Sequence, residues 1–100
     1  MKIKVKIARS LWDKVFGLID QRNTLPLLFY TRFGLHTFFL HQPIDVLVLS
    51  TDLTIQKIKE NLLPNSFFFY NPKFKLVLEL PKGFIKFNKL TLGDKISFIS

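Results

Sequence analysis

The sequence contains no cysteine, only four glycines and no long uninterrupted run of apolar residues. Without cysteine the chain can form neither a disulfide nor a thiolate metal site. The glycines are scattered, so there is no glycine-rich loop that could hold the phosphates of a nucleotide. A membrane-spanning helix needs about 20 apolar residues, and the sequence has no such stretch. These absences exclude disulfide-stabilised folds and disfavour nucleotide-hydrolysing enzymes.

The first residues also lack the pattern of a secretory signal. The stretch MKIKVKIARS alternates lysine with apolar residues and never gives way to a continuous apolar segment. On this basis we expect a cytoplasmic protein. One hundred residues, 48% of them hydrophobic, are enough for a single core, so we predict one domain over residues 1–100.

Acidic residues are scarce, because seven Asp and Glu stand against fifteen Lys and Arg, for a formal net charge of +8. A basic surface attracts polyanions, so nucleic acid and anionic membranes are natural partners. The basic residues are spread from Lys2 to Lys95, however, with no block of four or more. We therefore keep weak nucleic-acid binding as an alternative function without favouring it.

Short apolar segments separated by turn residues predict about seven β-strands. The predicted strands are Lys2–Ile7, Leu27–Thr31, Leu35–Leu40, Asp45–Leu49, Thr54–Lys59, Phe74–Leu80 and a last strand that contains Ile96 and Phe98. A helix is predicted over Leu11–Asp20, and a helical turn over Phe84–Asn88. The pattern indicates a mainly β, single-domain fold. We expect a β-sandwich or barrel-like structure of jelly-roll type with one short N-terminal helix.

Four consecutive aromatic residues, Phe67–Tyr70, lie between the turn pairs Pro64-Asn65 and Asn71-Pro72. They cannot all point inward from a strand, so we expect one or two to be exposed or to cover an edge. The favoured interpretation is a loop folded over the end of the core. The alternatives are a protein contact or a surface on which single-stranded bases stack.

Few polar groups could carry chemistry, and the candidates are His36, His41, Asp45, Glu79 and Asp94. Imidazole and carboxylate together can bind zinc, iron or manganese. A carboxylate can also orient an imidazole for acid–base catalysis. Both hypotheses require His36, Asp45 and Glu79 to converge in one pocket.

A structural role is the favoured alternative for the same groups. His36 and Asp45 would satisfy backbone groups around the corner at Pro43, because buried polar groups need hydrogen-bond partners. Glu79 would pair with Lys75 on an exposed strand face, a contact that contributes roughly 0–1 kcal/mol. The spacing matches no recognised metal-ligand pattern, so we predict no metal and no cofactor.

Five short motifs follow one another along the chain. They are Gly34-Leu35-His36-Thr37-Phe38, Pro43-Ile44-Asp45-Val46, Asn61-Leu62 before Pro64, Val77-Leu78-Glu79-Leu80-Pro81 before Gly83, and Gly93-Asp94. In this order and spacing they resemble the small prokaryotic proteins of the family called domain of unknown function 192. The resemblance implies a compact, mainly β domain of sandwich or jelly-roll character. It implies no biochemical activity, because none is established for the family.

The chain departs from the family pattern at several positions. Leu40 stands where methionine is usual, His41 where arginine or lysine is usual, and Gln42 where a hydrophobic residue is common. Asp52-Leu53 replaces the usual Asp-Gly turn. If the family's basic residue contacts an anionic ligand, His41 would make that contact weaker here, since imidazole is mostly uncharged at neutral pH.

The preferred functional hypothesis is a non-catalytic binding or accessory protein with a groove near Gly34–Asp45. Its candidate binding residues are His36, His41, Asp45, Phe68 and Tyr70. The first alternative is a small metal-dependent or acid–base enzyme that uses His36, Asp45 and Glu79. The second is a weak nucleic-acid binder that uses its scattered Lys and Arg and the run Phe67–Tyr70, and the same run could receive a protein partner.

Overall fold

The computed structural model describes residues 1–8, 26–30, 35–36 and 42–99. Within them the chain is mainly β with one short helix. The strands are β1 (Lys2–Lys4), β2 (Lys6–Ala8), β3 (Leu27–Tyr30), β4 (Leu35–His36), β5 (Ile44–Leu49), β6 (Ile55–Leu62), β7 (Phe67–Phe68), β8 (Leu76–Pro81) and β9 (Ser97–Ile99), and the helix is α2 (Phe84–Phe87). The predicted mainly β class is confirmed.

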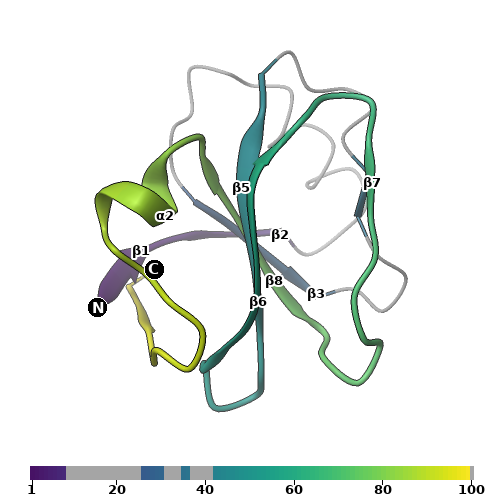
Figure 1. Ribbon diagram of the computed structural model, residues 1–100. Helices are drawn as coiled ribbons and strands as arrows, with labels where there is room; N and C mark the ends of the chain where they lie inside the picture. Colours follow the sequence, from purple (N-terminus) through teal and green to yellow (C-terminus); the bar gives the residue numbers. More distant parts are fainter. Residues whose placement is uncertain (9–25, 31–34, 37–41, 100) are drawn as a thin grey trace.

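A five-stranded sheet with the order β2-β3-β8-β5-β6 forms the centre of the molecule (Figure 1). Its pairs are antiparallel except for β2 and β3, which run parallel. Two small sheets accompany it, a parallel pair of β1 with β9 and an antiparallel pair of β4 with β7. Because β2 and β6 remain edges of the central sheet, the described strands do not close into a barrel.

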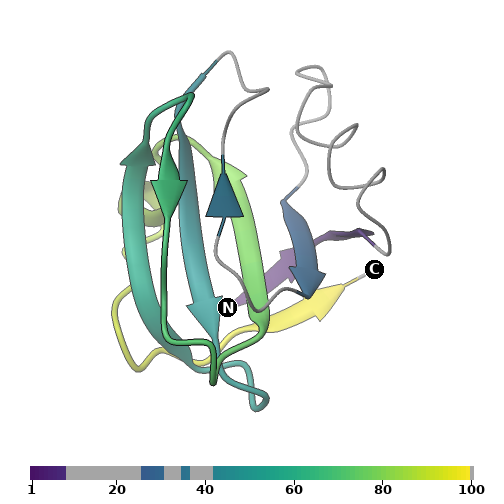
Figure 2. The ribbon, with the colours of Figure 1, turned by 90° about the vertical axis from the view of Figure 1, so that its right-hand side faces the viewer.

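The two faces of the central sheet bury two separate clusters of apolar side chains, because successive residues of a strand point to opposite faces. The first cluster contains Ile3, Val5, Leu47, Leu49, Ile55, Leu78, Leu80, Ile85, Leu90 and Ile96. The second contains Leu27, Val46, Val48, Leu62, Phe68, Tyr70 and Val77. We call the first side, which α2, β1 and β9 cover, the α2 side, and the second the β7 side. Figure 2 shows β4 and β7 in front of the sheet with α2 behind it.

Strand β5 explains why the sheet has a core on both sides. Val46, Leu47, Val48 and Leu49 are all fully buried. The prediction of a central strand covered on both faces is therefore confirmed. Complete burial of one such side chain contributes about 1.5–3 kcal/mol. Strand β1 is different, since Lys2 and Lys4 are exposed around a buried Ile3, as its period-two pattern predicted.

The tight turn predicted between β5 and β6 is present. The hydroxyl of Ser50 donates to Asp52, and the N–H of Leu53 donates to the carbonyl of Ser50 at 2.9 Å. Leu53 has φ 66°, in the left-handed region where glycine is usual. Leu53 packs partly against the first cluster, and burial of its side chain offsets the backbone cost.

Several sequence predictions need correction or fall outside the described residues. The predicted strand Lys2–Ile7 is divided between β1 and β2. Strand β8 begins only at Leu76, and Phe74 packs against the second cluster, on the face opposite to the one predicted. The helical turn after Gly83 is confirmed as α2. The predicted helix Leu11–Asp20 lies outside the described residues.

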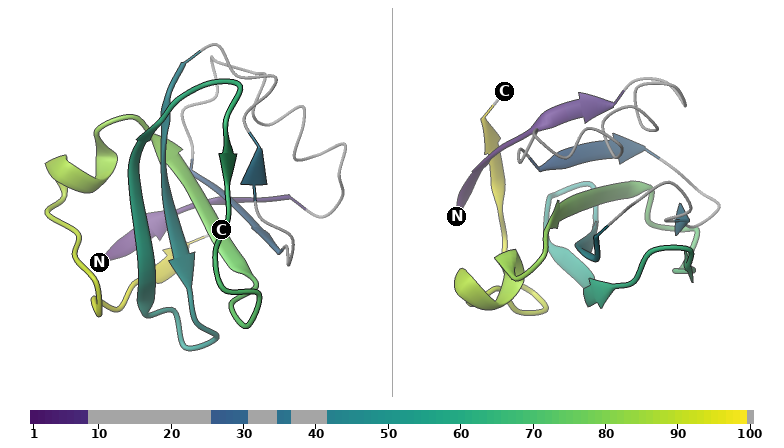
Figure 3. Two further views of the ribbon diagram at one scale, coloured as in Figure 1. Left: turned by 45° about the vertical axis from the view of Figure 1, so that its right-hand side comes forward. Right: turned by 90° about the horizontal axis from the view of Figure 1, so that it is seen from above.

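The described helix is only four residues long, and no helix in the described ranges could cross a membrane. The N-terminal and C-terminal strands lie side by side, because β1 pairs with β9 (Figure 3). This pair lies on the α2 side of the sheet, where Ile3 and Ile96 join the first cluster. The α2 side is thus built from both ends of the sequence.

Candidate functional site

Asp45 is buried, with 1% of its surface exposed, and both of its carboxylate oxygens accept hydrogen bonds from the backbone. The N–H of Asn61 donates to Oδ1, and the N–H of Ile85 donates to Oδ2, each at 3.0 Å. These bonds join β5 to the end of β6 and to the first turn of α2. Asp45 therefore has a structural role of the kind considered from the sequence. Its partners are not at the Pro43 corner but 16 and 40 residues further along the chain.

Glu79 is also buried, with 3% of its surface exposed, but on the other face of the sheet. In the strand register it lies between Leu27 of β3 and Val46 of β5, both members of the second cluster. The predicted surface pairing with Lys75 is therefore wrong, because the strand face that carries Glu79 is covered. Asp45 pairs in register with Leu80, on the first face.

The two buried carboxylates consequently do not meet. Asp45 shares its face with Leu47 and Glu79 shares its face with Val77, and the sheet separates them. A single acid–base or metal site cannot use both, because catalytic groups must reach a common substrate within hydrogen-bonding range. In the part of the chain that the structure describes, no three His, Asp or Glu side chains are grouped so that they could hold a metal ion.

The remaining polar candidates are placed as follows. His36 belongs to β4, where its backbone lies opposite Phe67 of β7; its side chain is not among the described features. His41 lies outside the described residues. Asp94 closes a turn, since its Oδ2 accepts from the N–H of Thr91 at 2.9 Å and from the Thr91 hydroxyl at 3.1 Å.

The aromatic run Phe67–Tyr70 alternates between core and surface. Phe68 and Tyr70 are buried in the second cluster, whereas Phe67 and Phe69 are 60% and 66% exposed. The exposed rings stack on each other with their centroids 5.9 Å apart. The prediction that one or two of these rings are exposed is confirmed. The binding candidates Phe68 and Tyr70, however, are the two that face the core.

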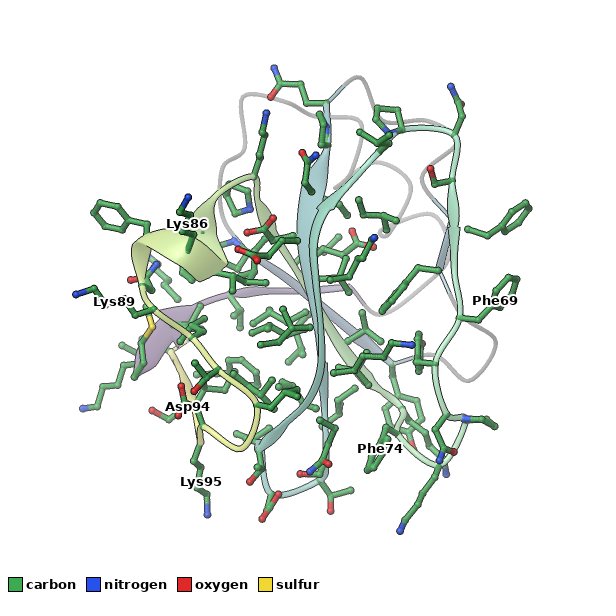
Figure 4. The ribbon with its side chains drawn as sticks, in the orientation of Figure 1. Phe69, Phe74, Lys86, Lys89, Asp94 and Lys95 are labelled. Atoms are coloured by element: carbon green, nitrogen blue, oxygen red, sulfur yellow. The ribbon has the colours of Figure 1, made fainter. Side chains whose placement is uncertain are left out.

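Lys57 on the neighbouring strand β6 is held against this run. Its Nζ lies 5.0 Å from the centroid of the Phe68 ring and donates to the carbonyl of Phe69 at 3.0 Å. Phe69 points outward on the β7 side, away from Lys86 and Lys89 on the α2 side (Figure 4). Lys57 therefore contacts the buried ring and the backbone of the run Phe67–Tyr70.

An open groove with a volume of about 690 Å³ lies on the α2 side, between β1 and α2. Its lining residues are Met1, Lys2, Ile3, Lys4, Pro26, Pro81, Lys82, Gly83, Phe84, Phe87 and Asn88. Three of these described lining residues are lysines and none is acidic. Phe87 is 86% exposed, the largest exposed fraction of any large hydrophobic side chain described. We call this feature the β1–α2 groove.

Sequence reasoning missed the β1–α2 groove and placed one near Gly34–Asp45 instead. Asp45 cannot line a surface groove, because it is buried, and most of the interval before it lies outside the described residues. The lysine face of β1 and the turn Pro81-Lys82-Gly83 were both visible in the sequence. Nothing in it brings them together, since nearly eighty residues separate Lys4 from Lys82.

Comparison with known proteins decides the family. The family model of domain of unknown function 192, described as "Uncharacterized ACR", matches residues 1–98. The chain belongs to this family. A UPF0127 protein of Pyrococcus abyssi is 31% identical over 103 aligned positions, which cover 97% of this chain and 87% of that protein. A UPF0127 protein of Thermococcus sibiricus is 29% identical and covers 95% of this chain and 66% of its own length.

Two solved structures resemble this member of the family. A Novosphingobium aromaticivorans protein of unknown function has a TM-score of 0.77 and 18% identity, over 91% of this chain and 71% of its own; this likeness concerns the fold alone. A Sinorhizobium meliloti protein, named as a candidate transcription regulator, has a TM-score of 0.73 and 26% identity, over 91% of this chain and 78% of its own. Residues that carry the family resemblance, such as Asp45, Gly93 and Asp94, hold backbone geometry in this structure.

Proposed function

We propose that this protein is a non-catalytic binding protein that takes an anionic ligand in the β1–α2 groove. The observation that carries the proposal is the lining of the groove, which combines Lys2, Lys4 and Lys82 with two phenylalanine rings and, among the residues that the structure describes, no acidic side chain. A volume of about 690 Å³ lies within the usual range of ligand sites, about 300–1,000 Å³. The net charge of +8 adds a long-range attraction for anions.

The placement of the carboxylates supports binding over catalysis. Both oxygens of Asp45 are held by backbone N–H groups, and Glu79 lies across the sheet. Neither lines the β1–α2 groove. The Sinorhizobium meliloti neighbour, which shares the fold, is named a candidate transcription regulator.

The proposal can be tested by NMR with sodium pyrophosphate as the probe. We expect the backbone amide signals of residues 2–4 and 82–88 to shift during the titration, since the phosphate oxygens would lie against Lys2, Lys4 and Lys82. Signals from Lys57 and Phe69, on the β7 side, should stay in place. Shifts spread evenly over all surface lysines, or no shifts in the groove, would overturn the proposal.

A matched pair of triple variants separates site binding from net charge. Replacement of Lys2, Lys4 and Lys82 by alanine removes three charges from the groove, and we expect pyrophosphate affinity to fall about tenfold or more at low salt. Replacement of Lys59, Lys73 and Lys75 by alanine removes the same charge elsewhere and should change affinity less than about twofold. Equal losses in the two variants would show that net charge, not the groove, binds the anion.

A further inference from the structure

We propose that the anionic ligand of the β1–α2 groove is single-stranded nucleic acid, whose bases stack on Phe87 while its phosphates contact the groove lysines. This inference rests on the proposed function and gives it a ligand class. Its starting point is Phe87, an aromatic side chain that is 86% exposed at the border of a basic groove. Folding alone does not require a ring in this position, because the Phe87 side chain stays exposed and folding buries little of its apolar surface.

The neighbours of Phe87 suit a ligand that has both a flat ring and negative charge. Lys82 precedes α2 and lines the groove with Phe87, while Lys86 and Lys89 are exposed on α2 and just after it (Figure 4). A nucleotide presents an aromatic base and a phosphate within a short distance of each other. Base stacking on an exposed aromatic side chain beside basic residues is how many proteins hold single strands without reading their sequence.

Strand β1 supplies repeated charge along the same groove. Lys2 and Lys4 are both exposed on one face of the strand, about 7 Å apart along it, because alternate residues share a face. Regular spacing of positive charge fits a polymer whose negative charges also repeat. The groove is open to solvent and not an enclosed cavity, so a polymer can enter it from the side.

An exposed aromatic ring favours single strands over duplexes, because unpaired bases expose their faces for stacking. In a duplex the faces of the bases are covered by neighbouring base pairs, so Phe87 could not stack on a base as it could in a single strand. The other exposed aromatic surface, at Phe67 and Phe69, is less suited to this role. Its rings stack on each other, and its lysine, Lys57, is bound to the Phe69 carbonyl.

The test compares two fluorescein-labelled oligomers by fluorescence anisotropy at low salt. One is a dodecamer of deoxythymidine, and the other is an abasic dodecamer with the same phosphates. We expect the protein to bind the first at least tenfold more tightly, and the ratio of the two affinities to fall close to one in Phe87→Ala. Because Phe87 is exposed, this substitution should leave the fold intact, which circular dichroism checks. The matched control Phe69→Ala should keep the full ratio.

Each other outcome overturns the inference in a recognisable way. Equal affinity for the two oligomers, while pyrophosphate still binds in the groove, would leave an anion-binding protein whose ligand is not a nucleic acid. Loss of the ratio in Phe69→Ala would move the stacking surface to the β7 side. Tighter binding to a duplex of the same length, or to vesicles with phosphatidylserine, would identify a different polyanion. Absence of binding to any of these probes, pyrophosphate included, would overturn the proposed function as well.

Discussion

The two sides of the central sheet each expose phenylalanine beside lysine, but they use these residues differently. On the β7 side, Phe67 and Phe69 stack on each other, and Lys57 is bound to the Phe69 carbonyl. On the α2 side, Phe87 lies at an open groove lined by lysines. The same residue types thus contact one another within the chain on the β7 side, whereas on the α2 side they line an open groove.

The two sides also differ in how they are attached to the sheet. The α2 side depends on a buried carboxylate, because Asp45 binds the N–H of Ile85 at the start of a helix only four residues long. The β7 side depends on buried rings, since Phe68 and Tyr70 fill the second cluster. A directional hydrogen bond to Asp45 positions α2, whereas the packing of buried rings positions the run Phe67–Tyr70. Substitutions that remove either the Asp45 carboxylate or one buried ring can test this difference.

The largest effect is expected for Asp45→Ala. The change leaves the buried N–H of Ile85 without its acceptor, at a cost of about 1–3 kcal/mol, and it also removes the part-buried hydrogen bond from the N–H of Asn61. We expect the free energy of unfolding, measured by urea denaturation, to fall by about 4 kcal/mol. Asp45→Asn keeps one acceptor oxygen and should lose about half as much. If Asp45→Ala lowered the urea midpoint no more than the control Asp52→Ala at an exposed position, the stabilising role of Asp45 would be contradicted.

A smaller loss of about 3 kcal/mol is expected for Phe68→Ala, because it removes a buried ring from the second cluster. Phe69→Ala, one residue away, should change the free energy of unfolding by less than about 1 kcal/mol, since its ring is mostly exposed. Urea denaturation of both variants checks the alternation directly. Similar losses in the two variants would contradict the assignment of these rings to core and surface.

The smallest effect concerns the turn on the α2 side. The hydroxyl of Ser50, followed by the hydroxyl of Thr54, holds the pKa of Asp52 below its ordinary value of 3.8. A carboxyl whose pKa is lowered by folding stabilises the fold above its unfolded pKa, and this contribution disappears as the pH falls through the folded pKa. We expect a slight loss of thermal stability below about pH 4 that is absent from Asp52→Asn. Identical pH profiles for the unchanged protein and Asp52→Asn would show that the Asp52 carboxylate does not contribute to thermal stability.

Much of the strand pattern could be predicted from the sequence. Local periodicity is enough to find β5, because Val46–Leu49 is apolar on both faces, and to find the lysine face of β1. The turn at Ser50–Thr54 and the helical turn after Gly83 were also predictable, since their signals are local. Phe74 was assigned to the wrong face because periodicity does not reveal that β8 begins only at Leu76.

The sequence could not predict the partners of the buried carboxylates. Asp45 and Glu79 look alike as isolated acids among apolar residues. Their faces follow from the register of β5 with β8, in which Asp45 lies opposite Leu80 and Val46 opposite Glu79. Register is a long-range property, and a shift by one residue would exchange the two faces. The hypothesis of a shared site depended on information that no local pattern contains.

By itself, the sequence determined the mainly β class, the family and the strongly basic charge, because composition, period-two patterning and short motifs are local or additive properties. Only the tertiary structure decided which of these charges lie together. It placed Lys2 and Lys4 from the start of the chain beside Lys82 and Phe87 from near its end, and it attached α2 to the sheet through Asp45. The physical reason is that a groove forms between elements, and pairing and packing across the whole chain decide which elements become neighbours.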